Sequence, residues 1–411
     1  MQRLLFSVLL LAVIGGAPAV SLSKEVAEKA NFPFPSHKGP GPYCRAVAGS
    51  KDEDALRAYN VWKETLVTRD GANGFRRVVR PDTPDGRANS TVSEGISYAM
   101  ILAVYFNDQE LFDDVFRYSL HWSNARGLMH WYINSEGTEA CPGRNDCGAA
   151  SDADEDIAFA LIMADKQWGG WGALDKSYRQ YALRQIALVK KYEVTNRYVF
   201  TPGDEWKGDI VNLSYFAPAF YRIFGRYSND EAFWNKVIDI NYTLLFKTLN
   251  RKNGNVDNGL VPAWSTLKGE PIEAFPGALT YHQTDSVRTP IRIAQDYCWN
   301  GDPRAKQYLN KISSFFVKIG AHRISDGYLL DGTAHPEFGV KEQSSSAVFV
   351  ASAGIAAMAA GADPDFVKGT YDLVGTLKLN IRSTYYQLSW SAMALAFMTG
   401  NYFDLTSTNH N

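Results

Sequence analysis

The chain has 411 residues, of which 45% are hydrophobic and 21% charged, and its formal net charge is −2. This length and composition allow one large buried core, and the near-neutral charge gives no support for a nucleic-acid partner. Aromatic residues are frequent, with 10 Trp, 22 Tyr and 22 Phe. Such side chains are numerous enough both to fill a core and to line a binding surface.

The first 43 residues are predicted to form two segments outside the main fold. Residues 1–19 have the pattern of a secretory signal peptide: Arg3 gives the positive start, residues 4–14 a short apolar run, and residues 17–19 a small-residue cleavage site. The apolar run is too short to span a bilayer. We therefore expect an exported protein, extracellular or periplasmic, with no membrane segment. Residues 20–43 are rich in Pro and Gly and are expected to form an extended arm.

Four cysteines follow the signal segment: Cys44, Cys141, Cys147 and Cys298. In an oxidising compartment they could form two bridges, for which three connectivities are possible. Cys141 and Cys147 bracket a short loop that contains Pro and Gly, so this pair is favoured. A bridge between Cys44 and Cys298 is then the remaining, less supported pairing.

The rest of the chain has the pattern of a succession of helices. Twelve are predicted, with starts near Glu53, Glu94, Asp108, Asp154, Lys176, Ser214, Asn229, Asp285, Asp302, Ser344, Asp363 and Tyr386. Capping signals precede several of the apolar-periodic runs, namely Asn107-Asp108, Ser228-Asn229 and Asp302-Pro303. Strand signals are short and weak, as at residues 198–200, and no linker divides the chain. Residues 44–411 are therefore predicted to form one all-α domain.

These helices alternate between two kinds. One kind is amphipathic and carries charged faces, as in the helices predicted near residues 108, 176, 229, 302 and 363. The other kind is more apolar all round and should be buried, as in those near residues 94, 154, 214, 285, 344 and 386. Six buried helices surrounded by six outer ones form an (α/α)6 barrel. In such a barrel the starts of all inner helices lie at one end.

The segment SDADED at residues 151–156 is the most distinctive in the chain. It places four carboxyls, Asp152, Asp154, Glu155 and Asp156, at the start of an apolar helix. One interpretation is a capping box with Asp152 as the N-cap and Glu155 three residues later. That interpretation accounts for only one or two of the four carboxyls. Asp154 and Asp156 are interpreted as capping or supporting groups rather than as catalysts.

Two further carboxyls stand at predicted starts of inner helices. Glu94 begins a buried helix that includes Tyr98, so it is either a residue that suits the helix dipole or an acid whose pKa is raised by enclosure. Asp285 precedes Arg288 and Arg292, so it either forms a structural ion pair or is a carboxylate kept ionised to act as a base. Two carboxyls held in different surroundings are what glycoside hydrolysis requires.

The segment AASDADEDIAFALIMADKQW resembles the signature of glycoside hydrolase family 8. The resemblance continues through TVSEGISYAM, HWYI, DEWKG, NLSYF and TDSVRTP, covers most of the chain, and is strongest to the bacterial endoglucanase branch of the family. It implies an (α/α)6 barrel and an inverting hydrolysis of β-1,4-linked glycans without a metal or cofactor. No histidine spacing in the chain suggests a metal site, and His130 and His282 are interpreted as hydrogen-bonded filling residues.

The resemblance also implies roles for individual residues. Glu94 matches the proton donor, Asp285 matches the base that activates water, and Asp152 matches the acid that binds the distorted sugar at the cleavage point. Four further residues are implied to bind substrate, as aromatic platforms or beside the base: Trp131, Trp206, Tyr215 and Arg288. Tyr98, which the sequence places beside Glu94, is also expected to bind substrate.

Two positions depart from the pattern of the endoglucanase branch. Thr284 stands where Tyr is usual, and Glu205 stands where Arg is common. We expect a secreted, monomeric endo-β-1,4-glucanase acting on cellulose or mixed-linkage β-glucan, with xylan and chitosan left open as substrates. The alternative of another class is a non-catalytic glycan-binding protein, which would need neither Glu94 nor Asp285. A magnesium-dependent cyclase that uses the acidic cluster is disfavoured by the signal peptide and by the lack of a second acidic motif.

Overall fold

The computed structural model describes residues 30–83, 87–143, 147–336, 346–376 and 384–407. The predicted signal peptide and the first part of the predicted arm therefore lie outside the described residues. Within the described residues, helices dominate and the only named strands form three two-stranded sheets. The prediction of an all-α fold is confirmed.

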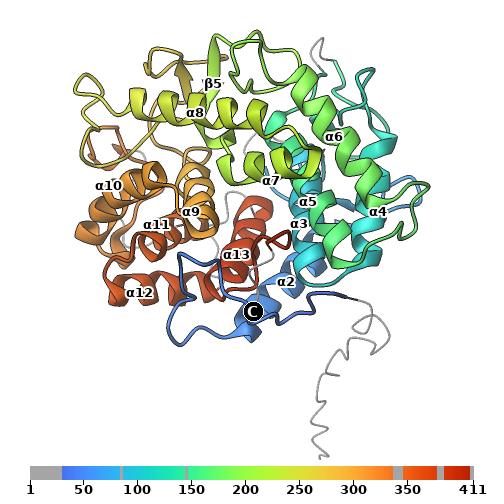
Figure 1. Ribbon diagram of the computed structural model, residues 1–411, viewed down its shortest axis with the longest axis horizontal. Coiled ribbons are helices and arrows are strands. Elements are labelled where there is room, and N and C mark those ends of the chain that lie inside the picture. Colours follow the sequence, from blue (N-terminus) through green and yellow to red (C-terminus); the bar gives the residue numbers. More distant parts are fainter. Residues whose placement is uncertain (1–29, 84–86, 144–146, 337–345, 377–383, 408–411) are drawn as a thin grey trace, which may run out of the picture.

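Six helices form an inner ring (Figure 1): α3 (Ser93–Tyr105), α5 (Ser151–Gln167), α7 (Pro218–Ser228), α9 (Arg288–Asn300), α11 (Ala347–Ala360) and α13 (Thr384–Met398). Each packs against the next, and α13 packs against α3, so the ring is closed. Most side chains of α3, α5, α11 and α13 are buried on every face, as their apolar sequences predict. Even so, none of the described helices is both long and apolar enough to span a membrane.

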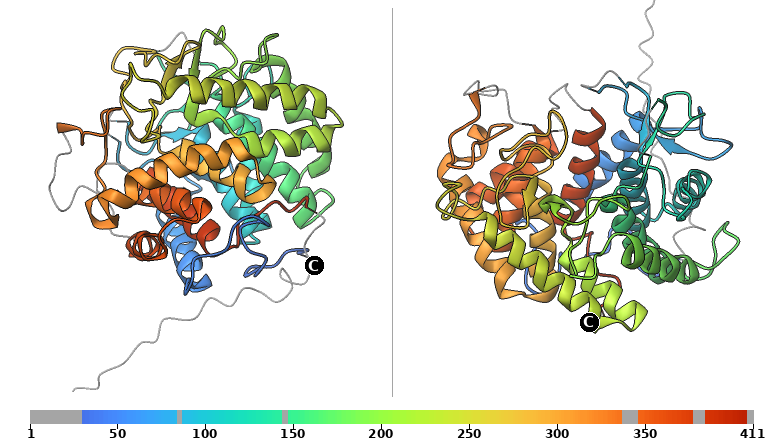
Figure 2. Two further views of the ribbon diagram at one scale, coloured as in Figure 1. Left: turned by 60° about the vertical axis from the view of Figure 1, so that its left-hand side comes forward. Right: turned by 90° about the horizontal axis from the view of Figure 1, so that it is seen from above.

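Six helices surround this ring: α2 (Asp52–Leu66), α4 (Gln109–His121), α6 (Tyr178–Tyr192), α8 (Glu231–Thr248), α10 (Pro303–Ile319) and α12 (Pro364–Gly375). Each of them packs on an inner helix and lies on the outside of the ring (Figure 2). In α10, for example, Tyr308, Leu309, Ile312 and Phe316 are buried on one face. The architecture is an (α/α)6 barrel, as predicted.

Most of the predicted helix starts are correct to within three residues, and two capping signals are confirmed. The Asp108 side chain accepts a hydrogen bond from Leu111 N, and Asp302 accepts one from Arg304 N. The start predicted at Ser214 is instead a 3-10 turn, η1 (Leu213–Tyr215), and α7 begins at a proline. The Asn229 cap is also wrong, because Asn229 ends α7 in the left-handed conformation that Asn tolerates.

Three short two-stranded sheets brace the chain next to inner-helix starts. β1 pairs with β2, β3 with β4 and β5 with β6, all antiparallel: β1 (Val67–Thr68), β2 (Arg77–Val78), β3 (Thr91–Val92), β4 (Tyr132–Ile133), β5 (Ile210–Asn212) and β6 (Trp264–Thr266). The weak strand signal at residues 198–200 gives only an isolated bridge between Val194 and Phe200. Because β3 leads directly into α3 and β5 into η1, these strand pairs fix the direction in which the chain enters α3 and η1.

The described part of the arm, residues 30–43, crosses the other end of the barrel. Asn31 N donates to Gln167 O at the end of α5, and the Phe34 ring lies 4.7 Å from that of Phe106 after α3. Both contacts lie at the carboxyl ends of inner helices. The arm therefore stabilises the end opposite to the inner-helix starts.

Two disulfides join the four cysteines in the favoured connectivity. Cys44 pairs with Cys298 and Cys141 with Cys147, with Cα atoms 5.0 and 5.5 Å apart. The first bridge fastens the end of the arm to α9. The second closes the loop that follows β4.

Candidate active site

Backbone contacts bring the first turns of α3 and α5 together around Trp131. Its carbonyl accepts a hydrogen bond from Ser93 N, and its amide donates to Gly148 O, both at 3.0 Å. Ser93 is followed by Glu94, and Gly148 lies just before Asp152. The antiparallel pairing of β3 with β4 therefore places Trp131 between the two helix starts that carry these carboxyls.

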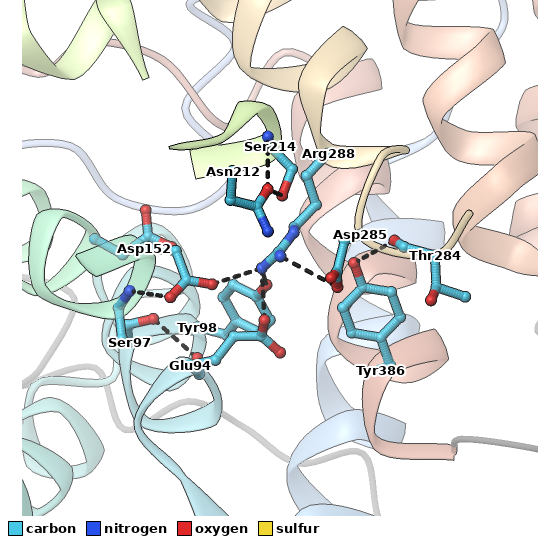
Figure 3. A network of polar contacts seen from close by, with 12 residues as sticks. Glu94, Ser97, Tyr98, Asp152, Asn212, Ser214, Thr284, Asp285, Arg288 and Tyr386 are labelled. Atoms are coloured by element: carbon cyan, nitrogen blue, oxygen red, sulfur yellow. Dashed lines mark hydrogen bonds and ion pairs between the residues drawn. The ribbon is translucent and has the colours of Figure 1, made fainter. Parts of the chain in front are cut away.

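A single guanidinium connects the three predicted catalytic carboxyls (Figure 3). Arg288 Nη1 lies 2.6 Å from Glu94 Oε2 and 2.7 Å from Asp152 Oδ2, and Nη2 lies 3.3 Å from Asp285 Oδ1. The Arg288 side chain is only 1% exposed. The carboxyls come from α3, α5 and the turn before α9, so the closure of the inner ring is what brings them together.

The surroundings of Glu94 favour its protonated form. Burial raises the pKa of its carboxyl, the Arg288 charge lowers it, and the charge of Asp152 raises it again, with the net direction upward. The Asp152 side chain is 4% exposed, and burial raises its pKa as well. A proton in this region is therefore held more tightly than by an isolated carboxyl.

Asp285 is the most exposed of the three carboxyls, with 36% of its side chain accessible. Desolvation raises the pKa of its carboxyl, the Arg288 charge lowers it, the Glu94 charge raises it again and a hydrogen bond with Gln283 lowers it, with the net direction upward. The ion pair with Arg288, three residues later in sequence, is the structural pair that the sequence allowed. Arg292, the other candidate partner, contacts Asp156 instead.

Tyrosines complete the wall around these groups. The Tyr98 hydroxyl lies 3.4 Å from Arg288 Nη1, and the guanidinium lies 5.1 Å from the centre of the Tyr215 ring. Both residues were predicted from the sequence, and both contact the central arginine. Tyr98 is almost fully buried, so it supports Arg288 and Glu94 rather than offering a free surface.

Two tyrosines of α13 were not predicted to belong to the site. The Tyr385 hydroxyl donates to Glu94 Oε1 at 2.7 Å, and the Tyr386 hydroxyl donates to the carbonyl of Thr284 at 2.9 Å. Gly95 allows this approach, because a Cβ at that position would lie 2.9 Å from the Tyr385 ring. The sequence did predict a helix start near Tyr386. Because the other inner-helix starts carry polar site residues, this start was the signal that could have identified the two tyrosines as part of the site.

Asn212, at the end of β5, is a third residue that was not predicted to belong to the site. Its Oδ1 accepts hydrogen bonds from Ser214 N at 3.0 Å and Ser214 Oγ at 2.7 Å, which fixes the orientation of the amide. Its Nδ2 has no hydrogen-bond partner among the described residues and is directed toward the side where Asp152 and Arg288 lie (Figure 3). The site therefore contains a fixed donor with unused capacity.

The acidic cluster does not form the capping box that the sequence allowed. α5 begins at Ser151, its N-cap Ala150 makes no side-chain cap, and Asp152 lies in the first turn. Glu155 accepts a hydrogen bond from the Tyr221 hydroxyl at 2.7 Å, and Asp156 pairs with Arg292 at 2.7 Å. These carboxyls are turned inward to partners on α7 and α9, so they act as supports below the site and not as caps.

Asp154, the remaining acid of the cluster, forms a buried pair with Glu193 at the end of α6. Burial raises the pKa of both carboxyls well above their usual values, and the hydrogen bond between them raises that of Glu193 further. Gln185 Nε2 donates to Asp154 Oδ1 at 2.9 Å. This burial favours a proton shared between the two carboxyls, and the pair joins α5 to α6.

We expect Glu193→Gln to reduce the loss of stability at high pH. In the unfolded chain both carboxyls ionise near their ordinary pKa values, whereas the folded pair keeps its proton. The contribution of the pair to the free energy of unfolding is therefore complete at pH values below the pKa of the carboxyls in the unfolded chain. It falls as the pH rises toward their raised pKa in the folded protein. The amide keeps a donor for Asp154 but has no proton to lose. Melting temperatures from pH 4 to 10 should converge at acid pH and favour the variant at alkaline pH. Parallel curves would contradict the shared proton.

Trp206 lies beside the start of α5, as a predicted platform should. Its amide donates to Gly203 O at 3.2 Å, and a Cβ on Gly203 would lie 2.2 Å from the Ala149 carbonyl, so this turn packs tightly against the segment before α5. The Trp206 ring stacks on Trp264 of β6, with centroids 5.4 Å apart. Trp264 was not predicted, because nothing in its local sequence marks it.

The two histidines near the site are bound by backbone carbonyls, as predicted. His130 Nδ1 contacts the carbonyl of Cys147. His282 is fully buried, its Nδ1 lies 3.0 Å from Val261 O, and burial lowers its pKa to about 4. A neutral, enclosed imidazole of this kind holds the turn before Asp285 in place.

An acid enclosed between aromatic rings and a more exposed carboxylate facing the same arginine suit the cleavage of a glycosidic bond. The protein is accordingly a glycoside hydrolase. Residues 45–400 match the family model described as glycosyl hydrolases family 8, and the chain belongs to that family. The resemblance seen in the sequence is thereby confirmed.

Known relatives are similar over nearly the whole chain. Endoglucanase A of Acetivibrio thermocellus is 37% identical over 96% of this chain and 79% of its own length. Endoglucanase 2 of Ruminiclostridium josui is 37% identical over 94% of this chain and 80% of its own length. Among solved structures, the apo beta-1,3-1,4-glucanase from Paenibacillus sp. X4 has a TM-score of 0.78 at 26% identity, and the match covers 90% and 98% of the two chains.

Proposed function

We propose that this protein is an exported, inverting endo-β-1,4-glucanase that hydrolyses cellulose or mixed-linkage β-glucan. The observation that carries the proposal is the contact of one buried arginine, Arg288, with Glu94, Asp152 and Asp285. Similarity to endoglucanases over nearly the whole chain supports a glucan as the substrate.

The two reacting carboxyls contact different nitrogens of the guanidinium. Glu94 lies against Nη1 and Asp285 against Nη2, so the width of the guanidinium separates them. Inverting glycosidases keep their carboxyls about 6.5–9.5 Å apart to leave room for a water molecule. The inverting mechanism therefore predicts this separation between the carboxyls of Glu94 and Asp285.

In the proposed reaction, Glu94 donates its proton to the glycosidic oxygen while the bond from that oxygen to the anomeric carbon breaks. Water attacks the same carbon from the opposite face, and Asp285 accepts the proton that the water loses. The new hemiacetal has the inverted configuration. Glu94 then regains a proton from solvent and Asp285 releases one, which restores the starting state.

Asp152 and Asn212 are proposed to bind the sugar at the cleavage point. A sugar hydroxyl both donates and accepts hydrogen bonds, an ionised carboxylate only accepts, and the free amide N–H of Asn212 only donates. Trp131, Trp206 and Tyr215 are proposed to hold neighbouring sugars by stacking.

Tyr385→Phe should move the alkaline limb of the pH–activity profile to higher pH. The Tyr385 hydroxyl stabilises the ionised form of Glu94 and so lowers its pKa. Without that donor, Glu94 keeps its proton to a higher pH and remains an active acid. The profile of kcat/KM against pH on soluble β-glucan measures this shift. Tyr386→Phe is the matched control, because its hydroxyl contacts a backbone carbonyl instead. An alkaline limb that stays in place would contradict the role of Glu94.

Export is supported by the two disulfides. Disulfides of this kind persist in oxidising compartments, and one of these joins positions 254 residues apart. Together with the signal-peptide pattern of residues 1–19, they favour action on an external polysaccharide.

Release of reducing ends from different polysaccharides tests the substrate. Carboxymethyl cellulose and lichenan should be cut at least tenfold faster than xylan or chitosan, with or without EDTA, and with a rapid fall in viscosity that marks internal cleavage. Faster release from xylan or chitosan would show that this polymer, and not a glucan, is the preferred substrate. Oligosaccharide binding without any release would indicate a non-catalytic glycan-binding protein.

A further inference from the structure

Trp264 is the centre of a group of aromatic contacts that extends away from the catalytic carboxyls. Its ring lies 5.4 Å from Trp206, 6.3 Å from Tyr215 and 5.4 Å from Phe275. Tyr215 in turn lies against the Arg288 guanidinium. An unbroken series of ring contacts therefore runs from the central arginine to Phe275, which the mechanism does not use.

Phe275 is half exposed, although it lies in an ordered turn. Its carbonyl accepts a hydrogen bond from Ala278 N at 2.9 Å, and the Glu273 carboxylate accepts one from Gly277 N at 2.7 Å. Ile272 N also donates to the carbonyl of Trp264, which fixes the turn to β6. The ring stands edge-on to Trp264, with an interplanar angle of 84°, and 49% of the residue is accessible.

An exposed ring in a fixed position is suited to binding a flat apolar surface. The side chain is already oriented, so little conformational entropy is lost when a ligand covers it. Pyranose rings with equatorial hydroxyls present apolar C–H faces that stack on aromatic rings. The continuity with Trp206 indicates that the ligand of Phe275 is a further part of the same polysaccharide chain.

We propose that Phe275 forms an additional distal subsite that stacks one more sugar ring of a long β-1,4-linked glucan, beyond the sugars held by Trp206. This inference rests on the proposed function. It makes the enzyme selective for long chains over short oligosaccharides.

Titration calorimetry with cello-oligosaccharides of increasing length tests the subsite. The Glu94→Gln background prevents turnover during the measurement. In that background Phe275→Ala should bind the longest oligosaccharides on the order of tenfold more weakly, and the shortest with unchanged affinity. Phe275→Tyr should retain the affinity for long chains. Trp171→Ala is the matched control, because Trp171 is 56% exposed and follows the carboxyl end of α5, away from the site.

The outcomes separate this inference from the proposed function. If the Glu94→Gln protein binds oligosaccharides of every length equally well with and without Phe275→Ala, the distal subsite is overturned and the proposed function is not affected. An equal loss at every length also overturns it, because the turn would then act on the catalytic centre. If the background binds no cello-oligosaccharide of any length, the proposed glucan substrate fails, and the subsite fails with it.

Discussion

Glu94→Gln is expected to lower kcat on β-glucan by on the order of 10²–10⁴-fold, because the glycosidic oxygen then leaves without a proton. The amide keeps the size of the side chain and the contact with Tyr385, so the fold should be unchanged. Aryl cello-oligosaccharides with a good leaving group need less protonation and should lose much less activity. Initial rates on both kinds of substrate measure the difference.

Asp285→Asn is the complement to this variant. Water must attack whatever the leaving group, so the loss should be equally large on the polysaccharide and on the aryl substrate. A small anion such as azide should restore part of the activity by replacing the water. If Asp285→Asn spared the aryl substrate and Glu94→Gln did not, the roles of the two carboxyls would be exchanged.

Arg288→Met is expected to have the second large effect, on both stability and activity. The substitution leaves Glu94, Asp152 and Asp285 without their shared cation, and breaking a buried ion pair in this way costs about 3–5 kcal/mol. Without the guanidinium, which lowers the pKa of all three carboxyls, these pKa values rise further. Asp285 then takes up a proton more readily and becomes a poorer base.

The pH dependence of the melting temperature identifies this mechanism. Carboxyls with raised folded pKa values contribute stability at acid pH that is lost as pH rises. The Arg288→Met variant should therefore approach the parent near pH 4 and fall increasingly below it toward neutral pH. Lys252→Met is the control, because it removes an ion pair with Glu270 that is exposed to solvent and therefore contributes little to stability. A deficit independent of pH would indicate lost packing instead of uncompensated charge.

The sequence was sufficient to predict the barrel because the signal is repeated. Helices that are apolar all round alternate with amphipathic ones, and this difference in burial follows directly from composition. Local pattern also located Glu94, Asp152 and Asp285, because each stands at the start of an apolar helix. The same pattern placed Tyr98 beside Glu94 and Arg288 beside Asp285, and the family resemblance then added the aromatic platforms.

What the sequence could not provide were contacts created by closing the ring. Tyr385 reaches Glu94 across 291 residues only because α13 packs against α3. Asp154 and Glu193 are joined by the packing of α5 on α6, so the capping interpretation of the acidic cluster failed. Arg288 was expected beside Asp285 alone, whereas it contacts three carboxyls.

The anomeric form of the first product tests the central claim most directly. Proton NMR during the first minutes of hydrolysis of a soluble β-glucan, before mutarotation, records the configuration of the new reducing end. A single displacement by water, with Glu94 as acid and Asp285 as base, predicts the α-anomer. Initial formation of the β-anomer would show a double displacement through a carboxylate nucleophile and would contradict the roles assigned to Glu94, Asp152 and Asp285.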